Sequence, residues 1–220
     1  MEKAVIFDMD GVIIDSEQAY KEAAYVLIDR LGFSVSEALF ETFTGRRSVD
    51  CWKMMMDVQD EDFDLDPILL AEEEEKIFFS LYYGEKQAVL VRGVQELMMK
   101  FRAMGIPMVV ASSSPVIAIE KMLSYFKLES VFSGFVSGSH VKHGKPAPDI
   151  FLAAAEKLNA KPGDCLVIED SDAGVEAANR AGMKVIGFAN PNSHNQKLNK
   201  ANLVVEDFMN EWDQIQKLLR

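Results

Sequence analysis

The chain alternates between short apolar runs and longer amphipathic stretches over most of its length. Six short segments carry the apolar, partly β-branched pattern of buried parallel strands. They are Lys3 to Phe7, Pro107 to Ala111, Phe132 to Ser137, Cys165 to Ile168, Lys184 to Phe188 and Asn202 to Val205. Helical periodicity occupies the intervals 93–104, 115–126, 148–158 and 172–181, and a last amphipathic helix follows residue 205. This alternation predicts an α/β fold, a mostly parallel Rossmann-like sheet with helices on both faces.

The stretch from Asp15 to Gly84 has a different pattern, because helical periodicity runs through it and no convincing strand interrupts it. Four helices are expected there: from Glu17 to Leu31 with Gly32 as its cap, after Ser34 or Ser36, after Ser48, and from Asp66-Pro67 towards Tyr83. We therefore expect residues 15–84 to form a small helical cap domain. The catalytic core would consist of residues 1–14 and 85–220.

Charge is concentrated in the expected cap. The whole chain of 220 residues has 35 acidic and 23 basic residues, a net charge of −12, and residues 15–84 carry 17 acidic and 6 basic residues, a net charge of −11. This balance is a poor match for nucleic acid or an anionic membrane surface. The run from Glu72 to Glu75 is expected to be a solvated helix face, so the acidic faces of the cap would point away from any pocket for an anionic substrate.

Two features favour a cytoplasmic protein. Cys51 and Cys165 are too few for a disulfide framework, which suggests a reducing compartment. The first strand is followed by Asp8 and Asp10, where a signal peptide would need apolar residues, and no apolar stretch approaches the length of a membrane span. We expect a monomer that needs neither a nucleic acid nor a membrane as a partner.

Polar side chains follow several of the expected strands, at the edge where ligands bind in parallel sheets. They are Asp8 and Asp10 after the first strand, Ser112 after the second, Lys145 on a loop, and Glu169 and Asp170 after the fourth. Four carboxylates so close together would repel one another unless a cation joined them. Mg²⁺ prefers carboxylates and shares its shell with substrate phosphate. The residue types therefore indicate phosphoryl transfer, with the hydroxyl and the ammonium available for phosphate oxygens.

Four segments carry a recognisable family resemblance. FDMDGV, VVASSS, HGKPAPDIF and VIEDSDAGVEAANRAGM resemble the four motifs of the haloacid dehalogenase superfamily, in the right order between Phe7 and Met183. The helical insertion after the first motif resembles the cap of the β-phosphoglucomutase-like subgroup.

The resemblance implies a role for each residue that matches a motif. Asp8 would be the nucleophile that takes the phosphoryl group, and Asp10 the general acid and base. Ser112 would donate a hydrogen bond to a phosphoryl oxygen, and Lys145 would neutralise charge on that group and on Asp8.

A metal site and a set of cap residues are also implied. Mg²⁺ would be bound by Asp8, Asp170 and the backbone carbonyl of Asp10, with Glu169 close by, through water. Cap residues that could recognise the substrate are Ser16, Tyr20, Arg46, Arg47 and Lys76. Lys76 could instead form a pair with Glu72 on its own helix.

The expected function is a Mg²⁺-dependent phosphatase that acts on a small phosphorylated metabolite, a sugar phosphate, through a phospho-Asp8 intermediate. One alternative is a β-phosphoglucomutase-type isomerase that uses the same residues. Two departures count against it: Tyr20 lies near the position where mutases carry a histidine, and Arg46 and Arg47 follow Gly45 directly. Another alternative is a non-catalytic phosphometabolite-binding protein, which would have no need of both a nucleophile and an acid.

Overall fold

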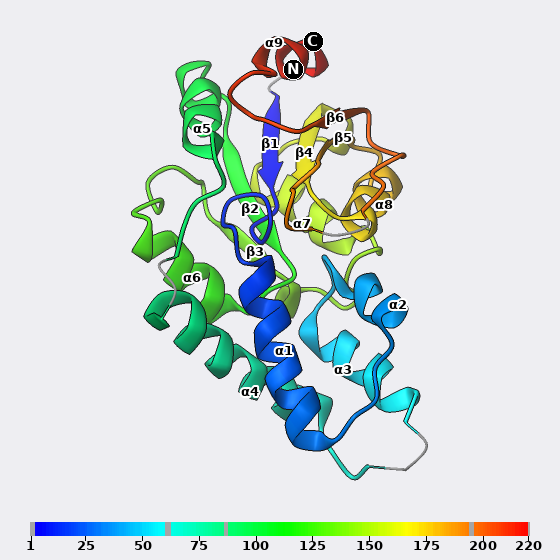
Figure 1. Ribbon diagram of the computed structural model, residues 1–220. Helices are drawn as coiled ribbons and strands as arrows, with labels where there is room; N and C mark the ends of the chain where they lie inside the picture. Colours follow the sequence, from blue (N-terminus) through cyan, green and yellow to red (C-terminus); the bar gives the residue numbers. More distant parts are fainter. Residues whose placement is uncertain (1–2, 60–62, 86–87, 194–195, 220) are drawn as a thin grey trace.

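A single parallel sheet forms the centre of the protein. The computed structural model describes residues 3–59, 63–85, 88–193 and 196–219, and within them six strands pair in the order β3-β2-β1-β4-β5-β6 (Figure 1). The strands are β1 (Ala4–Phe7), β2 (Met108–Ser112), β3 (Phe135–Ser137), β4 (Cys165–Glu169), β5 (Lys184–Phe188) and β6 (Leu203–Val205). Every pairing is parallel. The predicted Rossmann-like α/β fold is confirmed.

Helices cover both faces of this sheet. They are α5 (Val94–Ala103), α6 (Val116–Tyr125), α7 (Asp149–Lys157), α8 (Asp172–Arg180) and α9 (Trp212–Leu218). Side chains alternate along β1, so that Val5 and Phe7 pack with α5, α6 and α9. Ala4 and Ile6 pack with α7 and α8 on the other face. Because both faces are buried, the strands read as continuous apolar runs.

A group of helices lies beyond the carboxyl edge of the sheet, in the lower half of Figure 1. It consists of α1 (Glu17–Leu31), α2 (Glu37–Phe40), α3 (Ser48–Asp57) and α4 (Pro67–Phe79). Helices α1 and α3 both pack against α4. The group has an apolar core of its own around Trp52, Met55 and Leu27. These helices, called the cap below, lie over the polar side chains that follow the strands.

Two of these helices are shorter than the sequence pattern suggested. Helix α4 begins as expected, with Pro67 in its first turn and the Asp66 carboxylate accepting a hydrogen bond from the Ile68 amide at 2.8 Å. It stops at Phe79, and the chain continues in a π-helical turn, Ser80–Glu85. Helix α2 has only four residues and passes into a 3₁₀ turn. Among the described residues, no helix combines the length and apolar character needed to cross a bilayer.

The two connections between the sheet and α1–α4 lie side by side. Ile14 forms an isolated antiparallel bridge with Leu90. The Asp15 amide donates to the Val89 carbonyl at 3.1 Å, and the Val91 amide donates to the Ile13 carbonyl at 2.9 Å. The helical group is therefore joined to the sheet by two segments that are hydrogen-bonded to each other, close to Asp8 and Asp10.

Candidate active site

Asp8 occupies the centre of the carboxyl edge, directly after β1. Its amide donates to the Ile168 carbonyl of β4 at 3.0 Å, and its side chain is buried. The Lys145 ammonium donates to Asp8 Oδ1 at 2.6 Å and to Glu169 Oε1 at 2.7 Å. The Lys145 side chain has no exposed area. Three segments far apart in sequence thus meet in one buried group of charges, as the strand-end pattern predicted.

Glu169 is fixed from both sides. Its Oε1 accepts from Lys145, and its Oε2 accepts from the Ser171 amide at 2.7 Å and the Ser171 hydroxyl at 2.9 Å. Ser171 also caps α8 by accepting from the Gly174 amide at 3.0 Å. A Cβ at Gly174 would lie 1.7 Å from Glu169 Oε1, so only glycine allows α8 to approach this carboxylate. Both oxygens of Glu169 are therefore occupied in holding the site together.

Three carboxylates converge in a way that fits a divalent cation. Oxygens of Asp8, Glu169 and Asp170 lie within 4.8 Å of one another. Asp170 accepts a hydrogen bond from Ser193, and a Cβ at Gly11 would overlap its carboxylate. Burial raises the pKa of Asp8 to about 8, against the lowering effect of Lys145, and burial also raises the pKa of Asp170. Oxygen ligands that repel one another in this way are the donor set that Mg²⁺ takes.

The Asp10 carboxylate is not one of these three and is bound by hydroxyls instead. Its Oδ1 accepts from Ser16 at 2.7 Å, and its Oδ2 accepts from Ser114 at 2.7 Å and from Ser112 at 3.4 Å. Burial raises the pKa of Asp10 more than these hydrogen bonds lower it. A raised pKa favours the protonated carboxyl group, which is the form that a general acid needs.

The hydroxyls of Ser113 and Ser114, which follow β2, bind other groups instead of capping the next helix. A serine just before Pro115 would be a natural cap for the following helix, but Pro115 itself occupies the cap position, without a side-chain hydrogen bond. Ser113 donates to the Gly45 carbonyl at 2.7 Å, which joins the cap to the core. Ser114 contacts Asp10, and its amide donates to Ser112 Oγ at 3.0 Å. Ser114 is thus a site residue that the motif reading missed.

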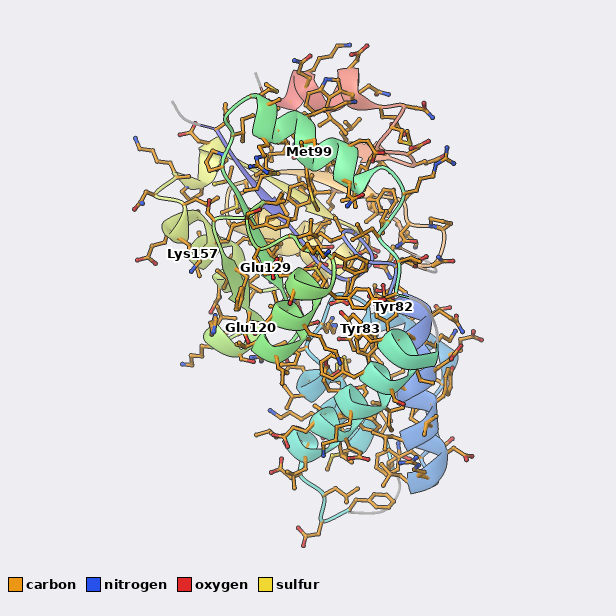
Figure 2. The ribbon with its side chains drawn as sticks, turned by 90° about the vertical axis from the view of Figure 1, so that its left-hand side faces the viewer. Tyr82, Tyr83, Met99, Glu120, Glu129 and Lys157 are labelled. Carbon is orange, nitrogen blue, oxygen red and sulfur yellow. The ribbon has the colours of Figure 1, made fainter. Side chains whose placement is uncertain are left out.

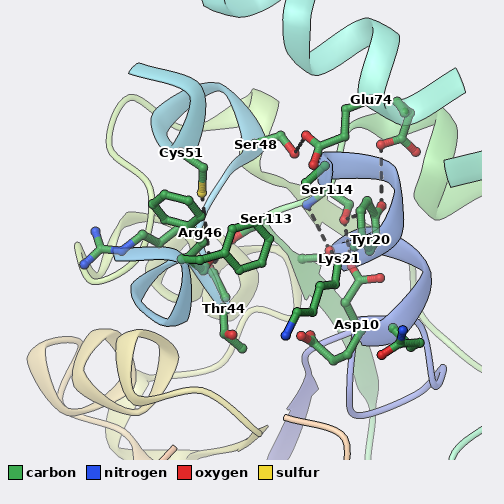
Figure 3. Close-up of a pocket in the computed structure, with 18 of the residues that line it drawn as sticks. Asp10, Tyr20, Lys21, Thr44, Arg46, Ser48, Cys51, Glu74, Ser113 and Ser114 are labelled. Atoms are coloured by element: carbon green, nitrogen blue, oxygen red, sulfur yellow. Dashed lines mark hydrogen bonds between the residues drawn. The ribbon is translucent and has the colours of Figure 1, made fainter. Parts of the chain in front are cut away.

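A cavity of about 160 Å³ opens above Asp8 and Asp10, between the core and the cap (Figure 3). Its core side includes Ser112, Ser113 and Ser114, and its other walls come from α1, α3, α4 and residues 40–48. Lys145, Glu169 and Asp170 lie beneath this lining. The arrangement places the carboxyl groups of Asp8 and Asp10 at the floor of a pocket with room for a small molecule.

A family model of haloacid dehalogenase-like hydrolases matches residues 2–182, which includes every residue of this site except Asn192, on the cavity wall, and Ser193. The chain belongs to this family. The fructose-1-phosphate phosphatase of Escherichia coli is 31% identical over 83% of the chain and 94% of that protein. The phosphorylated carbohydrates phosphatase of Thermotoga maritima is 34% identical over 84% of the chain and 83% of that protein.

Solved structures agree with these sequence relatives. A β-phosphoglucomutase from Clostridium difficile superimposes with a TM-score of 0.85 at 27% identity, over 100% of the chain and 97% of that chain. The predicted membership of the superfamily, the likeness to the β-phosphoglucomutase-like subgroup and the expectation of an enzyme are confirmed.

In this haloacid dehalogenase-like hydrolase, three of the five cap candidates reach the site. Ser16 is buried and donates to Asp10. The Tyr20 hydroxyl lies 3.5 Å from Ser114 Oγ and 3.5 Å from Glu75 Oε2. Arg46 lines the cavity, and its Nε donates to the Thr42 carbonyl at 2.8 Å.

The other two cap candidates are placed elsewhere. Arg47 forms two hydrogen bonds with Asp50, at 2.7 and 3.0 Å, and reaches the Val141 carbonyl of the core. Lys76 is on the outer side of α4, where its ammonium pairs with Glu73 at 3.2 Å and its side chain is 71% exposed. The alternative partner expected for Lys76 on this helix was Glu72, but Lys76 pairs with the next residue, Glu73. The structure does not bring Lys76 to the cavity of this hydrolase.

The expectation that the acidic cap faces point away from the pocket is wrong. Glu74 and Glu75 are buried and, with Glu17, line the cavity. Glu74 Oε2 accepts from Ser48 Oγ at 2.6 Å and Trp52 Nε1 at 3.0 Å, so neutral donors inside the cap make its burial possible. The run from Glu72 to Glu75 is split by the turn of the helix into an outer and an inner half, which composition alone cannot show.

Proposed function

We propose that this hydrolase is a phosphatase that removes the phosphoryl group from a small phosphorylated metabolite, a sugar phosphate, through a phospho-Asp8 intermediate. The observation that carries the proposal is the pair formed by Asp8 and Asp10. Asp8 is held by Lys145 at 2.6 Å, and Asp10, two residues later, presents a carboxyl group to the same cavity. The names of the Escherichia coli and Thermotoga maritima relatives, both phosphatases of phosphorylated carbohydrates, support the substrate class.

In the first half of the reaction an oxygen of Asp8 attacks phosphorus, and the bond between phosphorus and the leaving oxygen breaks. Asp10 gives its proton to that oxygen, since burial raises its pKa and Ser16 and Ser114 fix its carboxyl group. Ser112 and Lys145 bind the oxygens of the transferred group, over which its negative charge is spread in the transition state.

In the second half, Asp10 accepts a proton from a water molecule. The water oxygen bonds to phosphorus, the bond to Asp8 breaks, and inorganic phosphate leaves. Mg²⁺ held by Asp8, Asp170 and the backbone carbonyl of Asp10 would neutralise the negative charge of the phosphoryl group. Glu169, whose two oxygens are taken by Lys145 and Ser171, keeps the ammonium in place rather than reacting itself.

A second candidate is favoured by the superposition on a β-phosphoglucomutase. A mutase would use the same residues but pass the phosphoryl group from Asp8 to a second hydroxyl of a sugar phosphate. β-Glucose 1-phosphate with glucose 1,6-bisphosphate as primer separates the two candidates, because a mutase accumulates glucose 6-phosphate and a phosphatase releases inorganic phosphate.

The main test is a panel of sugar phosphates with Mg²⁺, with inorganic phosphate as the readout. Wild type is expected to turn over at least one member, Asp8→Asn none, and EDTA should stop turnover until Mg²⁺ is restored. Equal rates for wild type and Asp8→Asn would refute the proposed enzymatic activity. Activity that survives EDTA would exclude the metal from the mechanism. The monomeric state and the cytoplasmic location stay predictions, and the two free, buried cysteines support the location.

A further inference from the structure

One buried carboxylate oxygen lacks any hydrogen-bond partner. Across the described residues, Glu75 Oε1 is the buried side-chain oxygen or nitrogen for which the structure provides neither donor nor acceptor. Glu75 is only 8% exposed, and it lines the cavity above Asp8 and Asp10. Buried polar atoms in folded proteins are paired in the great majority of cases, so an unpaired one on a pocket wall indicates a missing ligand.

The preceding residue on the same helix, Glu74, is also buried but has hydrogen-bond donors from the cap. Glu74 is buried to a similar degree, and its Oε2 receives hydrogen bonds from both Ser48 and Trp52. Glu75 Oε2 receives one hydrogen bond, from the Tyr20 hydroxyl at the long distance of 3.5 Å. Lys76, the next residue, points outward to Glu73. The Lys121 ammonium is near enough to lower the pKa of Glu75, but it lies over the Phe79 and Tyr83 rings and does not reach Oε1. A ligand in the cavity is therefore the remaining source of a partner for Glu75 Oε1.

Polar groups connect Glu75 to the reacting end of the pocket. Ser114 donates to Asp10 at 2.7 Å, and its Oγ lies 3.5 Å from the Tyr20 hydroxyl, which in turn reaches Glu75 (Figure 3). The Tyr20 ring is fixed by stacking on Phe78 at 3.7 Å between centroids. A leaving group that takes its proton from Asp10 can thus extend along Tyr20 towards Glu75.

The missing donor has a definite chemistry. Burial, and next the charge of Asp10, raise the pKa of Glu75 to about 8. Below that pKa the free group is protonated, and a hydrogen bond donated by a ligand lowers the pKa again and favours the carboxylate. Sugar and polyol hydroxyls can donate to such an oxygen without bringing a charge of their own. A second phosphate, in contrast, would face four cap glutamates against two cations: Glu17, Glu41, Glu74 and Glu75 against Lys21 and Arg46.

We propose that Glu75 is a specificity-determining residue whose Oε1 accepts a hydrogen bond from a hydroxyl of the substrate's carbon skeleton. The protein then selects phosphorylated sugars and polyols over phosphate esters that carry no hydroxyl. The inference rests on the proposed phosphatase function and names the feature by which that function chooses its substrate. Tyr20 acts as a positioning residue for Glu75.

The test compares two esters in each variant. Sorbitol 6-phosphate and fructose 1-phosphate carry hydroxyls, and p-nitrophenyl phosphate carries none. Glu75→Met removes the acceptor and fills similar space, and it should lower the ratio of kcat/KM for the sugar phosphates to that for p-nitrophenyl phosphate by about tenfold or more. Glu75→Gln keeps an acceptor oxygen and should restore part of the ratio. Glu73→Gln, an exposed change on the same helix, should leave the ratio at the wild-type value.

Folding is monitored by thermal unfolding, where Glu75→Met should be as stable as wild type or more so, because it removes an unpaired buried carboxyl group. If this variant does not unfold cooperatively, Glu75→Ala replaces it with the same expected fall in the ratio.

The outcomes separate this inference from the function on which it rests. An unchanged ratio in Glu75→Met, or equal losses on both kinds of ester, would overturn the role of Glu75 while the phosphatase stands. Wild-type hydrolysis of p-nitrophenyl phosphate without any sugar phosphate would also overturn it. A wild type that hydrolyses no ester with Mg²⁺ would refute the phosphatase itself.

Discussion

The two walls of the cavity hold buried carboxylates by different means. At the sheet edge, Asp8 and Glu169 share the ammonium of Lys145, and Ser171 donates the remaining hydrogen bonds to Glu169. On the cap, Glu74 has only neutral donors, and Glu75 has one weak donor and an unpaired oxygen. The buried carboxylates of the sheet edge lack only a cation, whereas the cap wall lacks a hydrogen-bond donor for Glu75 Oε1.

This difference assigns separate tasks to the two regions. Preorganised charge at the sheet edge suits a reaction whose transition state is always the same phosphoryl group. An incomplete cap wall suits recognition, because a ligand that satisfies a buried polar atom binds more tightly than one that leaves it unpaired. Changes at the sheet edge should therefore affect all substrates, and changes on the cap wall should affect the choice among them.

The largest effect is expected from Asp10, which contacts residues of both walls. Asp10→Asn keeps the shape but cannot give a proton to the leaving oxygen, so kcat for a sugar phosphate should fall by about a thousandfold. With p-nitrophenyl phosphate, whose leaving group needs no proton, the first half of the reaction should survive. Stopped-flow measurement should then show a burst of p-nitrophenol, about one equivalent per enzyme, and slow release afterwards. Equal slowing of both esters without a burst would contradict the role of Asp10 as the acid.

Removing the ammonium that joins the buried carboxylates of the sheet edge should destabilise the whole fold. Lys145→Met leaves Asp8 and Glu169 buried without their ammonium, and the free energy of unfolding should fall by about 3–5 kcal/mol. Urea denaturation in EDTA measures this effect. Lys76→Met, the same change in an exposed pair, should cost less than about 1 kcal/mol. Similar losses in the two variants would show that the buried charges are not what distinguishes this edge.

The sheet edge could be predicted from the sequence, because its carboxylates stand directly after apolar runs, or at their ends, and the topology of parallel strands brings such positions together. Lys145 lies on a loop instead, and its Gly-Lys-Pro motif pointed to it. Asp8, Lys145, Glu169 and Asp170 meet in the structure as these patterns implied. Ser193, which donates to Asp170, follows no strand pattern and had no signal.

The cap wall could not be predicted in the same way. Its site residues depend on how far each helix is rotated about its axis, and a run of four glutamates does not reveal which two face inward. Lys76 was chosen from its place in the sequence, yet one position along α4 decides between the cavity, where Glu75 lies, and solvent. Likewise, a serine before Pro115 suggests a helix cap, although the Ser114 hydroxyl in fact donates to Asp10.

A smaller effect at the sheet edge follows from close packing alone. Gly174→Ala would place a Cβ 1.7 Å from Glu169 Oε1 and should force that carboxylate or α8 to move. The expected loss in stability is about 1–3 kcal/mol, with a fall in kcat for every substrate. Gly163→Ala is the control, since a Cβ there meets no atom within 4 Å. If both variants melt like wild type, the contact between α8 and Glu169 is not a constraint on this edge.

The smallest effect is expected on the cap wall, at Tyr20. Tyr20→Phe keeps the ring stacked on Phe78 but removes the hydroxyl that lies 3.5 Å from both Glu75 and Ser114. These are long hydrogen bonds, so kcat/KM for a sugar phosphate should fall only about threefold to tenfold. The fall should be mostly in KM, because Glu75 is positioned less well while Asp8 and Asp10 are unchanged. A loss that appears in kcat alone, and equally with p-nitrophenyl phosphate, would place Tyr20 with the sheet edge rather than with the cap wall.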